Sequence, residues 1–237
     1  MKAVIQAGGR GTRLRPYTLV MPKPLMPVGD SSVLEVLLKW LRRWDITEVY
    51  ITTGYLGHLI RTLCGDGNQW GLSIEYSEEP EPLGTVGALN HLKEHLTETF
   101  LMLNGDLITD LNVNDFVMFH EENEGALTVA TTDKLVNIDF GVIHNGRGHR
   151  ITGFNEKPTL TYQVSMGIYC MEPAVLELIP EGVPFGFDNL IHTMLKHEHP
   201  VHQYKHSGLW MDIGNEEDFN NAQESFTREY KSLVLGC

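Results

Sequence analysis

The sequence has few cysteines, no long hydrophobic run and a shortage of positive charge. Its three cysteines, among 237 residues, lie far apart and in no CxxC arrangement. This favours reduced thiols in a cytoplasmic protein over a disulfide framework or a structural zinc site. No run of about 18 apolar residues is present, and the first residues lead into a predicted strand, which differs from a signal peptide. A formal net charge of −13 argues against nucleic-acid and anionic-membrane partners, although a small phosphate site needs only local positive charge.

Two common nucleotide-binding motifs are also missing. No GxxxxGK[ST] string, the Walker A motif, occurs in the sequence. The dinucleotide fingerprint GxGxxG is incomplete, because the stretch Gly9-Arg10-Gly11-Thr12-Arg13-Leu14 ends in leucine. No cofactor-specific acidic residue follows the second predicted strand either. A dinucleotide-dependent oxidoreductase is therefore disfavoured.

Two kinds of segment alternate along the first part of the chain. Short runs rich in β-branched residues predict strands at 2–6, 48–53, 72–77, 99–104, 126–132 and 140–144. Amphipathic stretches predict helices at 32–44, 55–64, 85–96 and 113–122. This alternation predicts an α/β fold with a Rossmann-like, doubly wound, mostly parallel sheet in a three-layer α/β/α arrangement. Ligands in such sheets bind beyond the carboxyl ends of the strands.

The predicted helix over 32–44 has the clearest signals. Apolar residues recur at i, i+3, i+4, i+7 and i+8, and Trp40 and Trp44 belong to that pattern. We therefore expect both tryptophans in the core or, if exposed, at an interface. Ser32, with Glu35 three residues later, predicts a capping box at the start of this helix.

The second half of the chain differs in pattern. The string His144-Asn145-Gly146-Arg147 is typical of a hairpin turn. Further strands are predicted at 162–171 and 201–204, and helices at 173–179, 188–198 and 216–230. Because no linker, repeat or low-complexity tract interrupts the chain, we expect one domain over 1–237. Its two halves would span about 1–110 and about 111–237.

The loop after the first strand concentrates glycine and positive charge. Within residues 7–30, four glycines are combined with Arg10, Arg13, Arg15 and Lys23. Glycines after a strand let the backbone approach a polyphosphate closely. The cations suit a triphosphate whose pyrophosphate leaves, because negative charge grows on the leaving oxygens.

Several motifs together resemble one family. The loop reads GGxGTRLxPxTxxxPKPLxPVG, and it is followed in order by EEPEPLGTVGAL, LNGDL, FGVI, NEKP, VSMGIY and WMDIG. This order resembles the sugar-phosphate nucleotidyltransferases, also called nucleoside-diphosphate-sugar pyrophosphorylases, over essentially the whole chain. The string EPLGTVGAL is most similar to the GDP-sugar branch, which contains mannose and heptose 1-phosphate guanylyltransferases.

The resemblance implies a transferase of the EC 2.7.7 type in nucleotide-sugar biosynthesis. A sugar 1-phosphate oxygen would attack the α-phosphate of a nucleoside triphosphate in line and expel pyrophosphate. Since the nucleophile is already an anion, positioning and charge neutralisation would carry the catalysis. The implied partners are the two small substrates, without nucleic acid or membrane. Family members commonly form dimers or tetramers, so a homo-oligomer is compatible with the resemblance.

The resemblance also assigns the opening loop to the nucleotide. Arg13 would clamp the phosphates, and Lys23 would lie near the α-phosphate and the incoming sugar phosphate. The remaining nucleotide-binding residues would be Ala7, Gly8, Gly9, Gly11, Thr12, Glu79, Gly84 and Thr85.

Two aspartates are implied as ligands of the cofactor Mg²⁺. Asp106 follows a predicted strand, and Asp212 lies within an apolar flank. Two carboxylates, substrate phosphate oxygens and waters suit the octahedral coordination of Mg²⁺. From the residues alone, each aspartate could equally cap a turn or a helix. With Arg13 and Lys23, they complete the implied catalytic set.

The sugar phosphate is assigned to four positions by the same resemblance. Glu156 would accept hydrogen bonds from sugar hydroxyls, and Lys157 would neutralise the sugar 1-phosphate. Gly141 and Ser165 would contribute backbone or hydroxyl contacts.

The base and the sugar stay open at this point. A carboxylate from Glu79 or Glu81 would suit guanine, which offers N1–H and an amino group, so GTP is favoured. The resemblance to the GDP-sugar branch implies a manno- or heptose-type sugar 1-phosphate. Both acids could instead face solvent. Transfer of a thymidylyl, uridylyl or cytidylyl group to glucose 1-phosphate is the alternative. A catalytically silent regulatory subunit is more remote, because Arg13, Lys23 and both aspartates are present.

Overall fold

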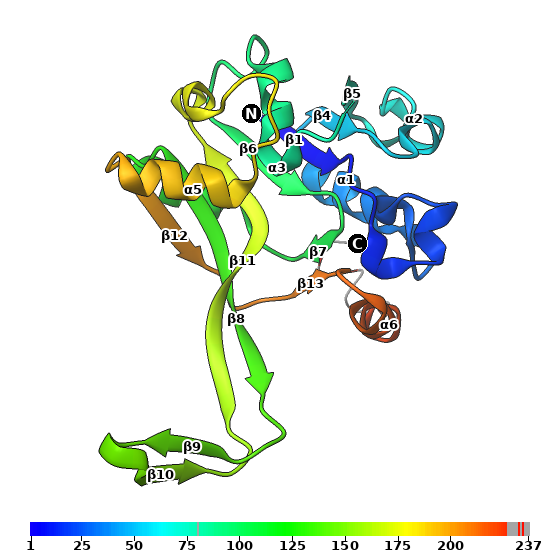
Figure 1. Cartoon of the computed structure of the whole chain (residues 1–237). Helices are drawn as coiled ribbons and strands as arrows, with labels where there is room; N and C mark the ends of the chain where they lie inside the picture. Colours follow the sequence, from blue (N-terminus) through cyan, green and yellow to red (C-terminus); the bar gives the residue numbers. More distant parts are fainter. Residues whose placement is uncertain (80, 227–231, 233, 235–237) are drawn as a thin grey trace.

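A seven-stranded sheet forms the centre of the protein. The computed structural model describes residues 1–79, 81–226, 232 and 234. Strand order is β12-β8-β11-β6-β1-β4-β5, and every neighbouring pair is parallel except the two that involve β11. Its strands are β1 (Lys2–Ala7), β4 (Glu48–Thr53), β5 (Ser73–Glu78), β6 (Phe100–Asn104), β8 (Leu127–Asn137), β11 (Thr159–Met171) and β12 (Val201–Lys205). The predicted mostly parallel α/β sheet is confirmed (Figure 1).

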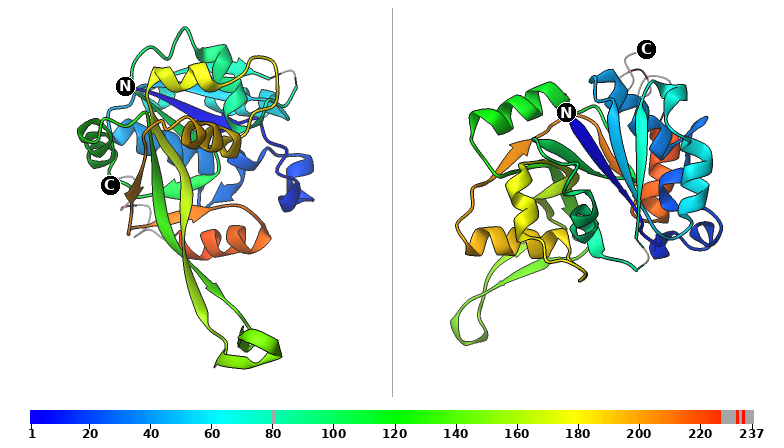
Figure 2. Two further views of the ribbon diagram at one scale, coloured as in Figure 1. Left: turned by 60° about the vertical axis from the view of Figure 1, so that its left-hand side comes forward. Right: turned by 90° about the horizontal axis from the view of Figure 1, so that it is seen from above.

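Helices cover both faces of the sheet (Figure 2). One hydrophobic cluster contains residues of α1 (Val33–Arg43), α2 (Gly57–Cys64), α4 (Val113–Glu122) and α6 (Glu216–Ser225). The other contains residues of α3 (Gly84–Gly87), the 3₁₀ turns Ala88–Leu92 and Pro173–Leu178, and α5 (Phe187–Lys196). Successive residues of one strand alternate between the clusters, as Val4 and Ile5 do, because side chains of a strand point to opposite faces. The result is a three-layer α/β/α structure.

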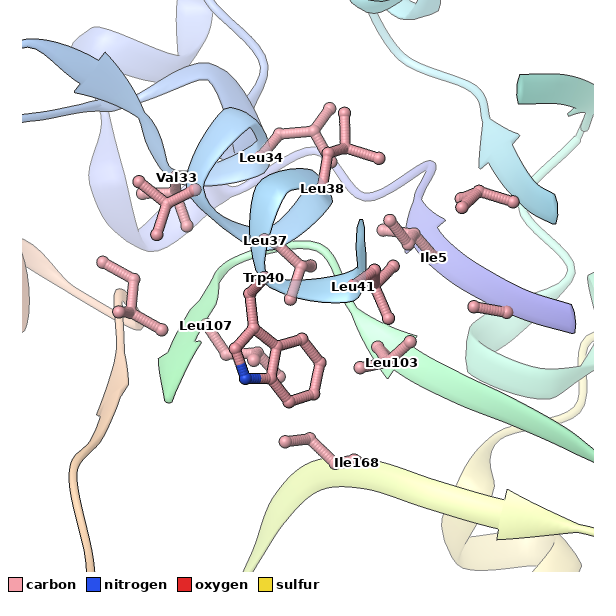
Figure 3. Close-up of a cluster of buried hydrophobic side chains, with 14 of the residues drawn as sticks. Ile5, Val33, Leu34, Leu37, Leu38, Trp40, Leu41, Leu103, Leu107 and Ile168 are labelled. Atoms are coloured by element: carbon pink, nitrogen blue, oxygen red, sulfur yellow. The ribbon is translucent and has the colours of Figure 1, made fainter. Parts of the chain in front are cut away.

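Helix α1 shows how the sequence pattern becomes packing. Its apolar stripe faces the sheet, and Trp40, which is 1% exposed, lies near Leu107 and Ile168 (Figure 3). The Glu35 backbone N–H donates to Ser32 Oγ at 3.2 Å, as the predicted cap requires. The Glu35 carboxylate instead accepts from Lys39 Nζ at 2.6 Å, so only half of the predicted capping box forms. The core placement predicted for Trp40 is confirmed, and Trp44 packs partly buried against the same cluster.

Some predicted elements have different forms in the structure. The stretch predicted as one helix over 85–96 is the short α3 followed by a 3₁₀ turn, and the helix predicted over 173–179 is a 3₁₀ turn. Helix α6 ends at Ser225, and the predicted continuation over 227–230 lies outside the described residues. Strand β8 continues five residues beyond its predicted end at 132. Among the helices in the described part of the chain, none is long and apolar enough to span a membrane.

A long two-stranded ribbon projects from the sheet (Figure 1). We call residues 132–164 the arm. Its strands are the outer parts of β8 and β11, which pair from Thr132↔Val164 to Asn137↔Thr159. At its tip, β9 (Val142–Asn145) and β10 (Ile151–Asn155) form the predicted hairpin. No residue of the arm, all of which is described, is buried.

Two short strand pairs complete the described structure. Strand β2 (Pro27–Val28) pairs with β3 (Ser31–Ser32) at the end of the opening loop. Strand β7 (Leu107–Thr109) pairs antiparallel with β13 (Trp210–Asp212). The second pair joins segments that lie about a hundred residues apart in the sequence, just beyond the carboxyl end of β6 (Figure 1).

Candidate functional site

The opening loop folds as three 3₁₀ turns beyond the end of β1. They span Thr12–Leu14, Tyr17–Leu19 and Lys23–Leu25. Gly11 has φ +57°, and a Cβ there would lie 2.9 Å from Thr18 Cγ2, so glycine is required on both counts. Thr18 Oγ1 donates to the Gly11 carbonyl at 2.8 Å. These contacts fold the loop back so that Lys23 reaches the end of the sheet.

A cavity of about 280 Å³ lies between this loop and β5. Gly8, Gly9, Glu79, Gly84 and Thr85 line it, as do four further residues, Gln6, Pro82, Asn104 and Asp106. We call it the nucleotide cavity. Thus five of the eight residues predicted to bind nucleotide surround a single space.

A smaller cavity of about 70 Å³ continues from it. The two cavities share Gln6, Gly9 and Asp106, and the smaller one is also lined by Ala7, Gly11, Lys23 and Pro24. We call it the phosphate cavity. Among the predicted nucleotide-binding residues, only Thr12 lies outside the linings of both cavities, all of whose residues are described.

Asp106 and Asp212 lie side by side because of the β7–β13 pairing. Asp212 is opposite Leu107 in that register, and the Ile213 N–H donates to the Asp106 carbonyl at 3.0 Å. The Trp210 indole N–H also donates to the Met166 carbonyl at 2.9 Å, which ties β13 to β11. The two predicted metal ligands therefore meet through backbone register.

Lys23 lies between these two carboxylates. Its Nζ donates to Asp106 Oδ2 and is 3.9 Å from Asp212 Oδ1. Burial raises the pKa of Asp212 above its ordinary value of 3.8, and the Asp106 carboxylate raises it further. The charges of Lys23 and Arg13 oppose this rise. The Arg13 charge thus acts on the Asp212 carboxylate, and its predicted role of clamping the phosphates stays a prediction.

The donor set fits a divalent cation. Asp106 Oδ1 is buried and, among the described residues, has no hydrogen-bond partner. A buried carboxylate oxygen left without a donor is costly unless something else binds it. Carboxylate oxygens from two chain segments, with room for phosphate oxygens, are what Mg²⁺ prefers. The predicted pair of ligands therefore fits this ion chemically.

Glu79 occupies the nucleotide cavity, whereas Glu81 is exposed and lines none of the cavities described above. Glu79 Oε2 accepts from the Leu83 N–H at 3.0 Å, which fixes the carboxylate. Burial raises the pKa of Glu79 above its ordinary value of 4.5, and this hydrogen bond partly offsets the rise. Of the two acids that could read a base, Glu79 is therefore the one that lines the nucleotide cavity.

The predicted sugar-phosphate residues are divided between two places. Ser165 lies where the arm joins the sheet, and its Oγ donates to Tyr169 Oη at 3.1 Å. Gly141, Glu156 and Lys157 lie at the far end of the arm, and the last two are exposed. A Cβ on Gly141 would lie 3.1 Å from Glu156 Oε2, so these two remain neighbours. The structure does not bring this group to Asp106 and Asp212.

Two residues of the nucleotide cavity were missed by sequence reasoning. Gln6 Oε1 accepts from Thr52 Oγ1 at 2.9 Å, and its buried Nε2 has no partner among the described residues. Asn104 lines the same cavity. The sequence does carry a signal for Gln6 and Asn104, because each is a polar residue at the end of an apolar run that predicts a buried strand.

A third cavity, of about 370 Å³, lies beside β13. Thr132, Asp133 and Lys134 at the base of the arm line it, together with α6 residues such as Asn221 and Ser225. Asp212 thus borders this space as well as facing Asp106.

This fold is found among the nucleotidyl transferases. The family model for nucleotidyl transferases matches residues 2–229, so the chain belongs to that family.

Two curated relatives show how the chain compares with known members. It is 34% identical over 226 residues to the mannose-1-phosphate guanylyltransferase catalytic subunit beta of Danio rerio. That alignment covers 92% of this chain and 62% of the relative. It is 31% identical over 256 residues to a UTP–glucose-1-phosphate uridylyltransferase of Synechocystis, which covers 99% and 66%. The chain thus spans slightly less than two thirds of the length of these relatives.

A solved structure agrees with the fold. HddC from Yersinia pseudotuberculosis superposes with a TM-score of 0.76, covering 95% of this chain and 99% of that one. At 23% sequence identity, this similarity supports the fold alone.

Proposed function

We propose that the protein is a sugar-1-phosphate nucleotidyltransferase that joins a nucleoside triphosphate to a sugar 1-phosphate. The observation that carries this proposal is the convergence of Lys23, Asp106 and Asp212 at the end of the nucleotide cavity. The reaction forms a bond between a sugar-phosphate oxygen and the α-phosphorus and breaks the bond from that phosphorus to the β-phosphate. The products are a nucleoside-diphosphate sugar and pyrophosphate.

The residues act by positioning and by charge. The nucleophile is an anion at neutral pH, so the chain needs no general base to activate it. Gly8, Gly9 and Gly11 let the triphosphate approach the backbone, and the Arg13 and Lys23 cations stabilise the charge that develops on the leaving oxygens. Asp106 and Asp212 would hold Mg²⁺, which would supply Lewis-acid stabilisation of the phosphoryl oxygens.

GTP is the nucleotide that the cavity favours. The fixed Glu79 carboxylate can accept two hydrogen bonds, from the guanine N1–H and from its amino group. The guanylyltransferase relative supports this choice and a manno-type sugar 1-phosphate. We also propose that residues of about 1–110 bind the nucleotide and those of about 111–237 the sugar phosphate.

Uridylyl transfer to glucose 1-phosphate is the second candidate. The specific observation in its favour is the uridylyltransferase relative, which aligns with 99% of this chain. Uracil has one N–H and would leave part of the Glu79 carboxylate unpaired, so it suits the cavity less well.

The test is pyrophosphate release from five nucleoside triphosphates, each combined with a panel of sugar 1-phosphates. We expect GTP with a manno- or heptose-type sugar 1-phosphate to give the fastest release. Asp212→Asn should remain folded and lose about two to three orders of magnitude in turnover. Pyrophosphate release by none of the pairs would reject the transferase, and wild-type turnover by folded Asp212→Asn would reject the role of the carboxylate pair.

A further inference from the structure

A fourth cavity, of about 300 Å³, adjoins the nucleotide cavity. We call it the outer cavity, and its volume is within the range of small-molecule sites. The two cavities share Gly8, Glu79 and Pro82, and the outer cavity is also lined by Arg10, Gly54, Tyr55 and Glu78. The proposed function gives no role to Arg10 or Tyr55.

Two glycines leave bare backbone on the wall of the outer cavity. Gly8 follows β1 and Gly54 follows β4, and these strands are neighbours in the sheet, with Ala7 opposite Thr53 (Figure 1). A Cβ on Gly54 would lie 3.0 Å from the Gly8 carbonyl oxygen, and a Cβ on Gly8 would lie 2.7 Å from Glu79 Oε1. Because no side chain covers this backbone, a planar group can lie against it beside the Glu79 carboxylate.

The Glu79 carboxylate supplies hydrogen-bond acceptors to this cavity. Its Oε2 accepts from the Leu83 N–H at 3.0 Å, whereas Oε1 accepts no hydrogen bond from the described residues. Glu78, the other acid of the outer cavity, is paired with Arg61 at 3.2 Å. An ionised carboxylate is an acceptor only, so Glu79 selects a ligand that has donors.

Arg10 supplies hydrogen-bond donors to the same cavity. Its guanidinium carbon is 6.0 Å from the centroid of the Tyr55 ring, and within the described part of the chain the guanidinium forms no hydrogen bond and no ion pair. The Tyr55 hydroxyl donates to the Leu19 carbonyl at 3.1 Å, which fixes the ring that the guanidinium lies over. A guanidinium has five N–H donors and no acceptor, so Arg10 selects a ligand that has acceptors.

Guanine is the base that has donors and acceptors on adjacent edges in this combination. Its N1–H and amino group are donors, and its O6 and N7 atoms are acceptors that arginine binds with two hydrogen bonds in protein–DNA complexes. Adenine has an amino group in place of O6, which would set donors against the Arg10 donors. Uracil has no N7 and one N–H, so it would leave part of both side chains unpaired.

We propose that the guanine of the nucleoside triphosphate binds between Glu79 and Arg10, where the carboxylate accepts from N1–H and the amino group and the guanidinium donates to O6 and N7. Arg10 is then a specificity-determining residue, and Tyr55 is a positioning residue that holds its guanidinium. This inference rests on the proposed function for the class of substrate and goes beyond it in the recognition of the second edge of the base.

The nucleotide 7-deaza-GTP, in which a C–H group replaces N7, tests the Arg10 contact in the binding step. Calorimetric titration of the full chain with GTP and with 7-deaza-GTP should show about tenfold tighter binding of GTP, because a hydrogen bond from a charged donor is lost in the analogue. Arg10→Met keeps an unbranched side chain and removes the donors, so this variant should bind the two nucleotides almost equally.

Arg15→Met is the matched control for the loss of a cation. Arg15 is exposed in the same loop and lines none of the four cavities. This variant should keep the wild-type preference for GTP over 7-deaza-GTP, because a loop cation acts equally on both nucleotides.

Two variants of Tyr55 test its positioning role. Tyr55→Leu should lower the preference for GTP over 7-deaza-GTP by about threefold, because the ring under the guanidinium is lost. Tyr55→Phe keeps the ring and should retain most of the preference. Since general damage to the fold would weaken both nucleotides alike, the ratio of the two affinities reports on the position of Arg10.

The outcomes separate this proposal from the proposed function. Equal binding of GTP and 7-deaza-GTP by wild type would overturn the role of Arg10, as would a preference that survives Arg10→Met. Absence of pyrophosphate release with every substrate pair would reject the transferase and leave the titrations to judge the recognition of guanine. A wild-type chain that binds no GTP would overturn both.

Discussion

Lys23 donates a hydrogen bond to Asp106 from a side chain that is only 12% exposed, so a lysine ammonium is enclosed at the carboxylate pair. Its Nζ also lies 3.9 Å from Asp212 Oδ1. The two aspartates would otherwise repel each other in a partly buried site, and the ammonium offsets that repulsion. A divalent cation that binds both carboxylates has to compete with this ammonium.

We predict that Lys23→Met binds Mn²⁺ about tenfold more tightly than wild type in the absence of nucleotide, because the competing positive charge is gone. The same variant should lose about two to three orders of magnitude in turnover, since the developing phosphate charge loses a partner. Calorimetric titration with Mn²⁺ measures the first effect and pyrophosphate release the second. Lys39→Met, which removes the half-buried pair with Glu35, should change neither, because that pair lies outside both cavities. Weaker Mn²⁺ binding by Lys23→Met would refute the competition.

A second prediction concerns base selection by Glu79. Glu79→Gln should lower kcat/KM for GTP by about ten- to a hundredfold, because a hydrogen bond to a charged acceptor is lost, and should change the value for UTP much less. Glu81→Gln is the matched control, since Glu81 is an exposed acid two residues away. Equal losses for both nucleotides would show that Glu79 supports the cavity without reading the base.

More of the fold than of the site could be predicted from the sequence. The helical spacing of apolar residues in α1 and the runs of buried apolar residues in the strands are regular patterns. These patterns predict the three layers of the fold. The approach of Asp212 to Asp106 depends on the register of two three-residue strands, which have no periodic signature. The sequence predicts the hairpin at the tip of the arm but not the outer parts of β8 and β11, because a ribbon without a buried face lacks the alternation that reveals a strand. The predicted strands therefore end at 132 and begin again at 162.

The raised pKa of Glu79 predicts a pH dependence of stability. Because of burial, the folded state binds the carboxyl proton of Glu79 more tightly than the unfolded state does. The contribution of Glu79 to stability therefore falls as pH rises from 4.5 through its higher folded pKa. Glu79→Gln lacks this loss, so its stability relative to wild type should increase with pH across that window and then level off. Urea unfolding of both proteins from pH 4 to 7 measures the difference. A constant difference would contradict the assignment.

The last prediction concerns Gln6, whose amide oxygen has a hydrogen-bond partner and whose amide nitrogen has none among the described residues. Thr52 fixes Oε1, so the buried Nε2 is already oriented where the nucleotide and phosphate cavities meet. Gln6→Leu should raise the KM for the nucleotide about tenfold, because the bound ligand loses a donor, and should leave kcat nearly unchanged.

The ligand-free protein supplies the control for Gln6. In the double variant Gln6→Leu/Thr52→Val, the unpaired amide nitrogen and the Thr52 hydroxyl that bonds its oxygen are removed together. The free energy of unfolding of this variant should equal that of wild type or be slightly higher. Thr52→Val by itself keeps the Gln6 amide but removes the hydrogen bond that orients it. This variant should therefore raise KM less than Gln6→Leu does. If Gln6→Leu lowers kcat with an unchanged KM, the amide acts on the transition state and not in ground-state binding.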